Sequence, residues 1–207
     1  MHVWNWSDIC RPKEEGGFGI RRVKDINSAS GFRLVWRLCT SNSLWAQWMS
    51  VHYLKGLHLY QASSSLLDSG TWKWICSMKG LALSYMAKLG NGEECSLVFN
   101  RWLANTSDIL IQNLSNTQLP NDVQNTKVSE IIEQGSWTCK FQFLQPIWHL
   151  ILHQSIPTTS DPDTWSWVGT KTGEFSFSSA WNLARDSDQK FEFADMILKD
   201  LGTIPKD

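Results

Sequence analysis

Residues 85–99 read Tyr-Met-Ala-Lys-Leu-Gly-Asn-Gly-Glu-Glu-Cys-Ser-Leu-Val-Phe, and they mark the place where a helical pattern gives way to a strand-like one. Gly90-Asn91-Gly92 separates two short apolar runs. Glycine and asparagine accept the positive φ angles of tight turns at low cost. The stretch therefore predicts a β-hairpin near residues 85–99.

Upstream of this turn, the sequence favours helices. Apolar residues spaced three and four apart predict an amphipathic helix that Asp25 caps and that ends near Thr40. A second helix is predicted to begin after Ser43 as its cap and to end at Lys55-Gly56, where glycine suits a C-terminal cap. The two helices are short and closely connected, so we expect them to pack together.

Glycines weaken two of the helical patterns. Gly31 interrupts the first helix, and Lys79-Gly80 is expected to break a third pattern that starts near Trp72. Further downstream, residues 104–127 are rich in Asn, Thr, Ser and Gln with little periodicity, which predicts a surface loop or linker.

Short elements are predicted after this linker. Ser129 is expected to cap a helix that ends at Glu133, and another helix over 143–153 is limited at its start by Pro146. Residues 164–177 alternate in character around a Lys-Thr-Gly turn, which predicts a second β-hairpin.

Ser178 is expected to cap a last helix that runs to about Arg185. Together these patterns predict a mixed α+β fold with a helix-rich N-terminal half and β-hairpins near 85–99 and 164–177.

Composition limits the class of protein. The chain has 207 residues, of which 42% are hydrophobic, so it is long enough to bury one sizeable core or two small ones. Its longest apolar runs, such as 147–152, are far shorter than the roughly 20 residues of a membrane span, and its N-terminus lacks a secretory signal. We therefore expect no membrane partner and an intracellular setting, nuclear or cytoplasmic.

The charges are distributed unevenly. The net charge is −1, but residues 1–60 carry eight Lys/Arg against four Asp/Glu, whereas residues 121–207 carry seven against twelve. A basic first third suits nucleic-acid contact, and a merely solvated basic face is the alternative.

The thirteen tryptophans are more often core fillers than base-stacking platforms, and we expect most of them to be buried.

Metal and nucleophile motifs are not recognisable. The five cysteines form no C-x-x-C pair, which favours buried free thiols over disulfides or zinc. His149 and His153 would share a helix face, but the glutamate of H-E-x-x-H is missing, so we predict structural histidines and no metal or cofactor. The acid pairs at 161/163 and 186/188 are predicted to be solvated.

The glycine-rich stretch 10–20, Cys-Arg-Pro-Lys-Glu-Glu-Gly-Gly-Phe-Gly-Ile, fits neither the Walker nor the dinucleotide-binding spacing. It is better explained as a shaped bend that leads into the first long helix. Basic residues flank this bend, and they could grip a nucleic-acid backbone because phosphate contacts require cations but no particular geometry. These candidate nucleic-acid-binding residues are Arg11, Lys13, Arg21, Arg22 and Lys24.

Three blocks of sequence resemble one family when they are taken together. The first combines the bend with Trp36-Arg37 and Ser43-Leu44-Trp45, the second is Leu89-Gly90-Asn91-Gly92 with Trp102-Leu103, and the third is Asp163-x-Trp165-x-Trp167 with Gly173-x-Phe175-Ser176 and Ser179-Ala180-Trp181. In this order and spacing they resemble plant non-LTR, LINE-type retrotransposon polyproteins, in the segment downstream of the reverse transcriptase domain.

The resemblance implies four segments. Residues 1–60 would be a basic helical segment that follows the reverse transcriptase, 61–103 a helix with a β-hairpin, 104–127 a polar linker, and 128–207 a small mixed α/β segment that resembles the truncated start of the zinc-binding reverse-transcriptase-associated domain. Some positions depart from the family: Val98 and Asn100 stand where Trp and Asp are usual, and the chain leaves the pattern after Asp186 before any zinc cluster.

The function that this resemblance implies is non-catalytic. Polymerase, endonuclease and ribonuclease H motifs are not found, and Tyr-x-Asp-Asp does not occur, although the full-length relative would be an RNA-directed DNA polymerase. RNA or an RNA–DNA duplex and an upstream reverse transcriptase domain are the expected partners. The alternative is a protein-interaction or scaffolding module without nucleic-acid binding.

Overall fold

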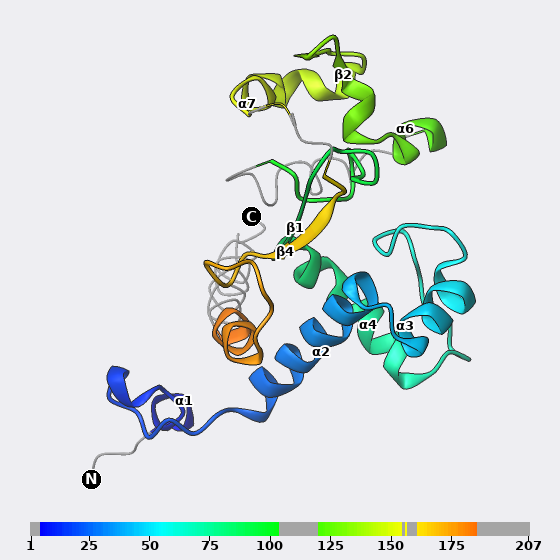
Figure 1. Ribbon diagram of the computed structural model, residues 1–207. Helices are drawn as coiled ribbons and strands as arrows, with labels where there is room; N and C mark the ends of the chain where they lie inside the picture. The colour runs from blue at the N-terminus through cyan, green and yellow to red at the C-terminus, as the bar shows by residue number, and fades with distance from the viewer. Residues whose placement is uncertain (1–4, 104–119, 155, 157–160, 186–207) are drawn as a thin grey trace, which may run out of the picture. The chain divides into compact units, whose positions relative to one another are not determined.

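A two-stranded antiparallel sheet joins segments that are far apart in the chain. β1 (Met86–Leu89) pairs with β4 (Thr164–Trp167), so that Met86 lies opposite Trp167 and Leu89 lies opposite Thr164 (Figure 1). The computed structural model describes residues 5–103, 120–154, 156 and 161–185.

The mixed α+β class is confirmed, and both strands lie where the sequence predicted β structure. The predicted pairing within two local hairpins is wrong, because each strand pairs with the other. Within the turn Gly90-Asn91-Gly92, only Gly92 has a positive φ angle, +80°, whereas a two-residue type I′ turn needs two. The chain instead leaves the sheet and returns at Arg101, whose carbonyl accepts the Lys88 N–H at 3.0 Å.

The Asp163 carboxylate holds the loop that follows β1. Its Oδ1 accepts the Gly92 N–H at 2.9 Å and its Oδ2 accepts the Glu94 N–H at 2.8 Å. A Cβ on Gly90 would lie 2.5 Å from the Asp163 Cα, so glycine is required for this close approach. Asp163 is therefore not the solvated acid that the sequence predicted, and it brings together the second and third of the sequence blocks.

Aromatic rings pack around the end of β4. Trp167 is fully buried, and its ring lies 4.8 Å from Phe175 and 6.1 Å from Trp36, both near-perpendicular. Trp36 and Phe175 in turn stack at 5.8 Å. Such pairs add to the free energy gained by burying the rings themselves. They attach the C-terminal half of α2 (Val23–Thr40) to the sheet.

The first long helix differs in detail from its prediction. α2 begins at Val23 and continues through Gly31 to Thr40, so Asp25 lies inside the first turn and is not the N-cap. Ala29, Phe32 and Val35 are fully buried on one face, which supplies tertiary packing that outweighs the low helix propensity of Gly31.

The second helical segment ends as predicted but changes its geometry midway. α3 (Leu44–Met49) is capped by Ser43, whose Oγ accepts the Ala46 N–H. A π-helical turn, η2 (Ser50–Leu54), continues it to Lys55 and Gly56, which have φ angles of +50° and +86°. No pattern of residues in the sequence predicts this π turn.

α4 (Gly70–Ser84) runs unbroken through Gly80, contrary to the predicted break. Its N-cap is Ser69, and its buried members include Trp72 and Ile75. Lys79 of α4 donates to the carbonyls of Tyr60 and Ala62 and so ties the preceding loop to the helix.

Short elements surround a second core after residue 95. The buried residues of this core come from the returning segment 95–103, from the 3-10 helices η3 (Val128–Ile131) and η4 (Gln142–Ile147), and from α7 (Trp148–Leu152). They are Cys95, Leu97, Trp102, Leu103, Val128, Ile131, Leu144, Ile147 and Ile151.

Two predictions for this region are corrected. The expected helix from Ser129 to Glu133 is η3 followed by β2 (Ile132–Glu133), which pairs with β3 (Ser136–Trp137). The helix over 143–153 is 3-10 up to Ile147 and α-helical only after it, because Pro146 has no N–H for the α pattern.

The predicted linker 104–127 contains a helix, α6 (Asn121–Asn125), and its Val123 packs against Val98 and Phe99. Residues 104–119 lie outside the described part of the chain.

The chain divides into two units. One comprises residues 1–33 and 176–207 and includes α1 (Trp6–Ile9) and η1 (Lys13–Glu15), and the other comprises residues 34–175.

A helix begins at residue 177 and its described part ends at 185. Its cap is Ser176, whose Oγ accepts the Ser179 N–H at 3.1 Å, and not Ser178. No helix in the described residues has the length and apolar character needed to cross a bilayer.

A half-buried histidine lies where two segments of the second unit meet. Nδ1 of His58 accepts the Tyr60 N–H at 3.1 Å, Nε2 lies 3.0 Å from the Asn100 side chain, and the ring stacks on Phe99 at 5.3 Å. Burial, with a smaller contribution from nearby lysines, lowers the pKa of His58 to about 4. His58 is therefore neutral at physiological pH.

We predict that Asp163→Ala lowers the free energy of unfolding by about 2 kcal/mol, because two backbone N–H groups lose a charged acceptor. Urea denaturation at neutral pH measures this loss, and hydrogen exchange at Gly92 and Glu94 should accelerate. Asp161→Ala is the matched control, since Asp161 contributes only its backbone carbonyl to Asn91. Equal effects of the two substitutions would contradict the role assigned to the carboxylate.

We predict that His58 makes stability fall as the pH is lowered from about 6.5 to about 4. The unfolded histidine takes up its proton near pH 6.5 and the folded one only near 4, so the contribution is complete above 6.5 and lost on the way to 4. The loss is on the order of 3 kcal/mol at most.

Urea denaturation across this range should show a flatter pH dependence for His58→Gln than for the parent chain. His153→Gln, at an exposed position, should leave the dependence unchanged. An unchanged slope in His58→Gln would mean that carboxylates alone cause the acid sensitivity.

Candidate nucleic-acid interface

The glycine-rich stretch forms a closed bend, as the sequence predicted. After η1, Gly16 adopts the left-handed conformation with a φ angle of +83°. The Glu15 and Gly17 N–H groups donate to the Pro12 carbonyl at 3.0 Å, and the Phe18 N–H donates to the Ile9 carbonyl at 3.0 Å. Because the N–H groups of residues 15–19 donate to carbonyls of residues 9–13, they are not arranged as a phosphate cradle.

Gly17 is the position that this closure requires. A Cβ there would lie 2.1 Å from the Arg11 carbonyl oxygen, which also accepts the Gly19 N–H at 2.9 Å. No side chain can replace glycine without moving the backbone. The bend thus fixes where the side chains of Arg11 and Lys13 leave the chain.

The five predicted basic residues have different surroundings. Arg11, Lys13, Arg21 and Lys24 are exposed, and Arg22 is half-buried. Arg11 pairs with Asp8 at 3.0 Å, and both side chains are largely accessible. The pair is therefore weak, and Arg11 can exchange Asp8 for another anion. Four of the five cations therefore reach solvent within a stretch of 14 residues.

Arg22 is engaged by a buried carboxylate. Its Nε donates to Oδ2 of Asp25 at 3.0 Å, and Asp25 is only 2% exposed. Removing the partner of a buried charge is costly, so this pair fixes the start of α2. Of the five residues, Arg22 is the one whose contacts suit structure best.

The helix at 177–185 supplies an aromatic partner for the bend. The Arg21 guanidinium lies 5.0 Å from the ring centroid of Trp181, and the Arg185 guanidinium lies 5.7 Å from it. Cation–π contacts of this kind orient an arginine without neutralising its charge. Arg21 is thus held in place while it stays exposed.

Arg185 also closes the bend through an ion pair. Its Nη1 donates to both carboxylate oxygens of Glu15, at 2.7 and 3.0 Å. This hydrogen bond, together with the charge of Arg185, holds the pKa of Glu15 below its usual value. Glu15, one of the two acids of the bend, is therefore paired with an arginine from another segment, which reduces its repulsion of a phosphate.

Sequence reasoning missed Trp181, Arg185 and Glu15 as members of this surface. The final helix and its apolar members were predicted, but they were not connected to the bend because 170 residues separate Glu15 from Arg185. The available signal was the spacing of Trp181 and Arg185, which lie four positions apart and so on one face of that helix.

The other candidate residues are in local structural contacts. Nδ1 of His153 donates to the His149 carbonyl at 2.6 Å, a contact within one helical turn. Across the described residues, no group of three or more His, Cys, Asp or Glu side chains is arranged to hold a metal ion. Asp186 and Asp188 lie outside the described part.

The cysteines and tryptophans vary in burial. All five thiols are free, but only Cys10 and Cys95 are fully buried and Cys139 is exposed. Burial, as the main cause, raises the pKa of the Cys95 thiol to about 12. Trp6, Trp48 and Trp74 are exposed, so the tryptophans are not uniformly core residues.

Comparison with known proteins gives one informative relative. The chain is 26% identical over 197 residues to a protein of Arabidopsis thaliana named "Putative ribonuclease H protein". The match covers 88% of this chain but only 31% of that protein. No protein-family model matches the chain, and no solved structure matches it.

We predict that Gly17→Ala destabilises the bend, by about 1–3 kcal/mol, because the added methyl group meets the Arg11 carbonyl. Hydrogen exchange at Phe18 and Gly19 measures the opening of the bend. Gly80→Ala is the control, since nothing lies within 4 Å of its added Cβ and alanine favours the helix. Unchanged protection in Gly17→Ala would show that the bend does not depend on this close approach.

Proposed function

We propose that this chain is a non-catalytic segment of a retrotransposon-derived polyprotein of the LINE type, and that it binds an RNA or RNA–DNA backbone through the basic bend. The observation that carries the proposal is the exposure of Arg11, Lys13, Arg21 and Lys24 around a bend whose shape is fixed by its own hydrogen bonds. A rigid loop that presents exposed cations suits phosphate contacts, which need charge but little geometry.

The similarity to the Arabidopsis protein supports the origin of the chain. A name that refers to ribonuclease H is typical of retrotransposon-derived proteins in plants. The sequence blocks that resemble LINE-type polyproteins supply the finer assignment, to the segment downstream of a reverse transcriptase domain. Since this chain spans 31% of that relative, the activity of a longer protein would reside in the remainder.

The absence of recognisable polymerase, endonuclease and ribonuclease H motifs supports a role without catalysis. In a longer chain, the segment would hold template or duplex beside the polymerase, and no metal or cofactor would be needed for such contacts.

The decisive experiment is a salt titration of binding to single-stranded RNA, followed by fluorescence anisotropy. Each phosphate contact contributes about −0.7 to the slope of log K against log salt for a single strand. The double variant Lys13→Ala/Lys24→Ala should therefore make the slope shallower by about 1.4, and the RNA should stay intact with magnesium present.

The matched control is Lys140→Ala/Lys171→Ala, which removes the same charge from exposed positions in the other unit. Its slope should equal that of the parent chain. No binding at low salt, or equal slopes for the two double variants, would overturn the proposal. Cleavage of the RNA that depends on magnesium would overturn its non-catalytic part.

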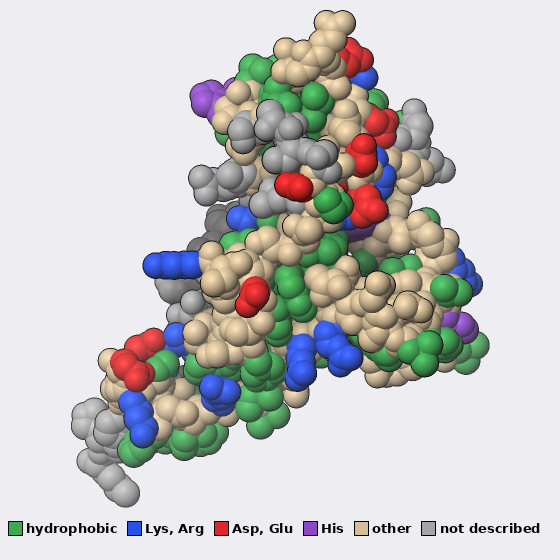
Figure 2. All heavy atoms as spheres, in the orientation of Figure 1, with side chains coloured by type: hydrophobic (Ala, Val, Ile, Leu, Met, Phe, Trp, Pro, Cys, Tyr) green, Lys and Arg blue, Asp and Glu red, His purple; other side chains and the backbone are tan. Residues whose placement is uncertain are grey.

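A second candidate function, a protein-interaction module, is favoured by the apolar surface of the second unit. Hydrophobic side chains gather at the surface over α3 (Figure 2). Leu44, Val51, Leu66 and Leu67 are each at least 78% exposed. Such exposure typically marks interaction surfaces. Concentration-dependent sedimentation without RNA affinity would favour this function over the first.

A further inference from the structure

The solvent-facing side of α3 and η2 is apolar. The two elements form one continuous helical segment, and α3 buries Ala46 and Met49 on its inner side. A surface helix normally turns charged or polar side chains toward solvent. Here Leu44, Trp48 and Val51 are 83%, 53% and 78% exposed. These three residues form an apolar stripe that the described part of the chain leaves uncovered.

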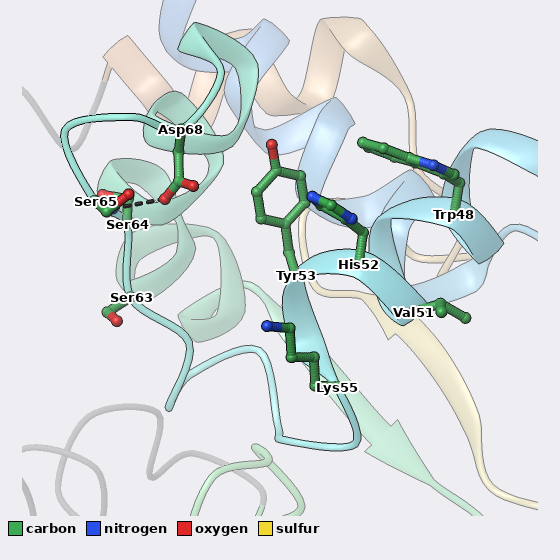
Figure 3. A pocket seen from close by; sticks show the side chains of 9 residues that line it. All are labelled: Trp48, Val51, His52, Tyr53, Lys55, Ser63, Ser64, Ser65 and Asp68. Atoms are coloured by element: carbon green, nitrogen blue, oxygen red, sulfur yellow. Dashed lines mark hydrogen bonds between the residues drawn. The ribbon is translucent and has the colours of Figure 1, made fainter.

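The stripe has the spacing of a helix-packing surface. Its members are separated by four and three residues, so they follow one another along one side of the segment. Figure 3 shows Trp48, Val51 and Lys55 on the ribbon of this one segment. A row of side chains at this spacing fits into the grooves on the surface of a second helix.

A cation stands at each end of the stripe. At its N-terminal end, the exposed Arg37 places its guanidinium 5.6 Å from the ring centroid of Trp45. At its C-terminal end, the exposed Lys55 borders the same open pocket as Trp48 and Val51. From residue 44 to residue 55 a helix rises by about 16 Å, which sets the separation of the two ends.

Acidic side chains are scarce in this part of the chain. Residues 26–67 contain no Asp or Glu, and residues 34–84 carry four Lys/Arg against a single acid, Asp68. That acid is engaged by its own loop, because its Oδ2 accepts the Ser65 N–H at 2.6 Å. The surface around the stripe therefore attracts an anionic partner.

We infer that α3 and η2 dock an amphipathic helix of a partner protein, with an apolar face and acidic residues about eleven positions apart. The apolar face packs along the stripe, and the acids meet Arg37 and Lys55 at its two ends. This inference gives the second candidate function a class of partner, and it does not depend on nucleic-acid binding by the first unit.

An acidic helix fits this surface better than a nucleic acid does. Bases stack on aromatic rings, but two of the three members of the stripe are aliphatic. The third, Trp48, already has one face covered by the His52 ring at 4.7 Å. A phosphate backbone would leave Leu44 and Val51 in water, whereas a helix buries them and still reaches the cations.

A second copy of this chain fits the stripe less well. Two copies that meet here across a two-fold axis bring the cations of one copy to those of the other. Because residues 26–67 contain no acid, these like charges repel without compensation.

The test measures the binding of a designed helical peptide to the full chain by fluorescence anisotropy. The acidic peptide, about 20 residues long, carries leucines three and four positions apart and glutamates at both ends of the leucine row. The basic peptide has lysine in place of each glutamate. The parent chain should bind the acidic peptide about tenfold more tightly, because the exposed cations attract one peptide and repel the other.

Leu44→Gln/Val51→Gln should weaken binding of the acidic peptide about tenfold, since it removes apolar contact and keeps a residue that favours helix. The matched control is Val23→Gln/Leu152→Gln, which changes exposed side chains of the same kinds outside α3 and η2. This control should bind like the parent chain. Circular dichroism checks that each variant is folded.

Arg37→Gln/Lys55→Asn should bind the acidic and basic peptides about equally. Asparagine suits position 55 because it accepts the positive φ angle there. The control Lys140→Ala/Lys171→Ala, which removes two cations elsewhere in the same unit, should keep the preference for the acidic peptide.

Equal affinity of the parent chain for the two peptides, or no binding of the acidic one, would overturn the inference and leave the nucleic-acid proposal standing. A weaker RNA affinity of Leu44→Gln/Val51→Gln would place nucleic acid on the stripe and also overturn it. If that variant abolishes a concentration-dependent sedimentation of the parent chain, the stripe binds a second copy and the inference is overturned.

Discussion

The second unit depends on one carboxylate and the strand pair beside it. Asp163 accepts two N–H groups from the loop after β1, and the next four residues form β4. These contacts connect positions about seventy residues apart, so the chain closes a long loop before the sheet gains any stability. Trp167, at the end of the same strand, then buries its ring against Trp36 and Phe175. Polar and apolar contacts of one short segment thus fix the central part of the fold together.

Local chemistry explains most of what the sequence predicted correctly. Ser43 as a cap, the helix end at Lys55-Gly56 and the bend at residues 10–20 each depend on neighbours within a few positions. The pairing of β1 could not be predicted in this way, because Gly90 resembles a turn glycine and its actual reason, the close approach of Asp163, lies far along the chain. The break predicted at Gly80 does not occur for a related reason, since the packing of α4 outweighs the low helix propensity of glycine.

In the candidate interface, too, the residue types could be predicted from the sequence and their contacts could not. The five basic residues were identifiable from composition, but which of them pair with an acid and which keep their charge available was not. Arg22 is engaged by Asp25, whereas Arg21 lies over Trp181 and keeps its charge available. Glu15 would weaken a phosphate site if it were unpaired, and Arg185 removes much of that effect. The π turn η2 could not be predicted either, because no residue pattern distinguishes it from an α-helix that continues.

The register of β1 and β4 has a consequence for how such a chain can be rearranged. Leu89 lies opposite Thr164, so the two ends of the segment 90–163 are neighbours in space. A segment whose ends meet has the geometry of an insertion, and its interior can be lengthened or exchanged as long as Arg101 and Asp163, which anchor it beside β1, are kept. The second core at 95–151 is, in this sense, a module carried between the two halves of a minimal β-unit.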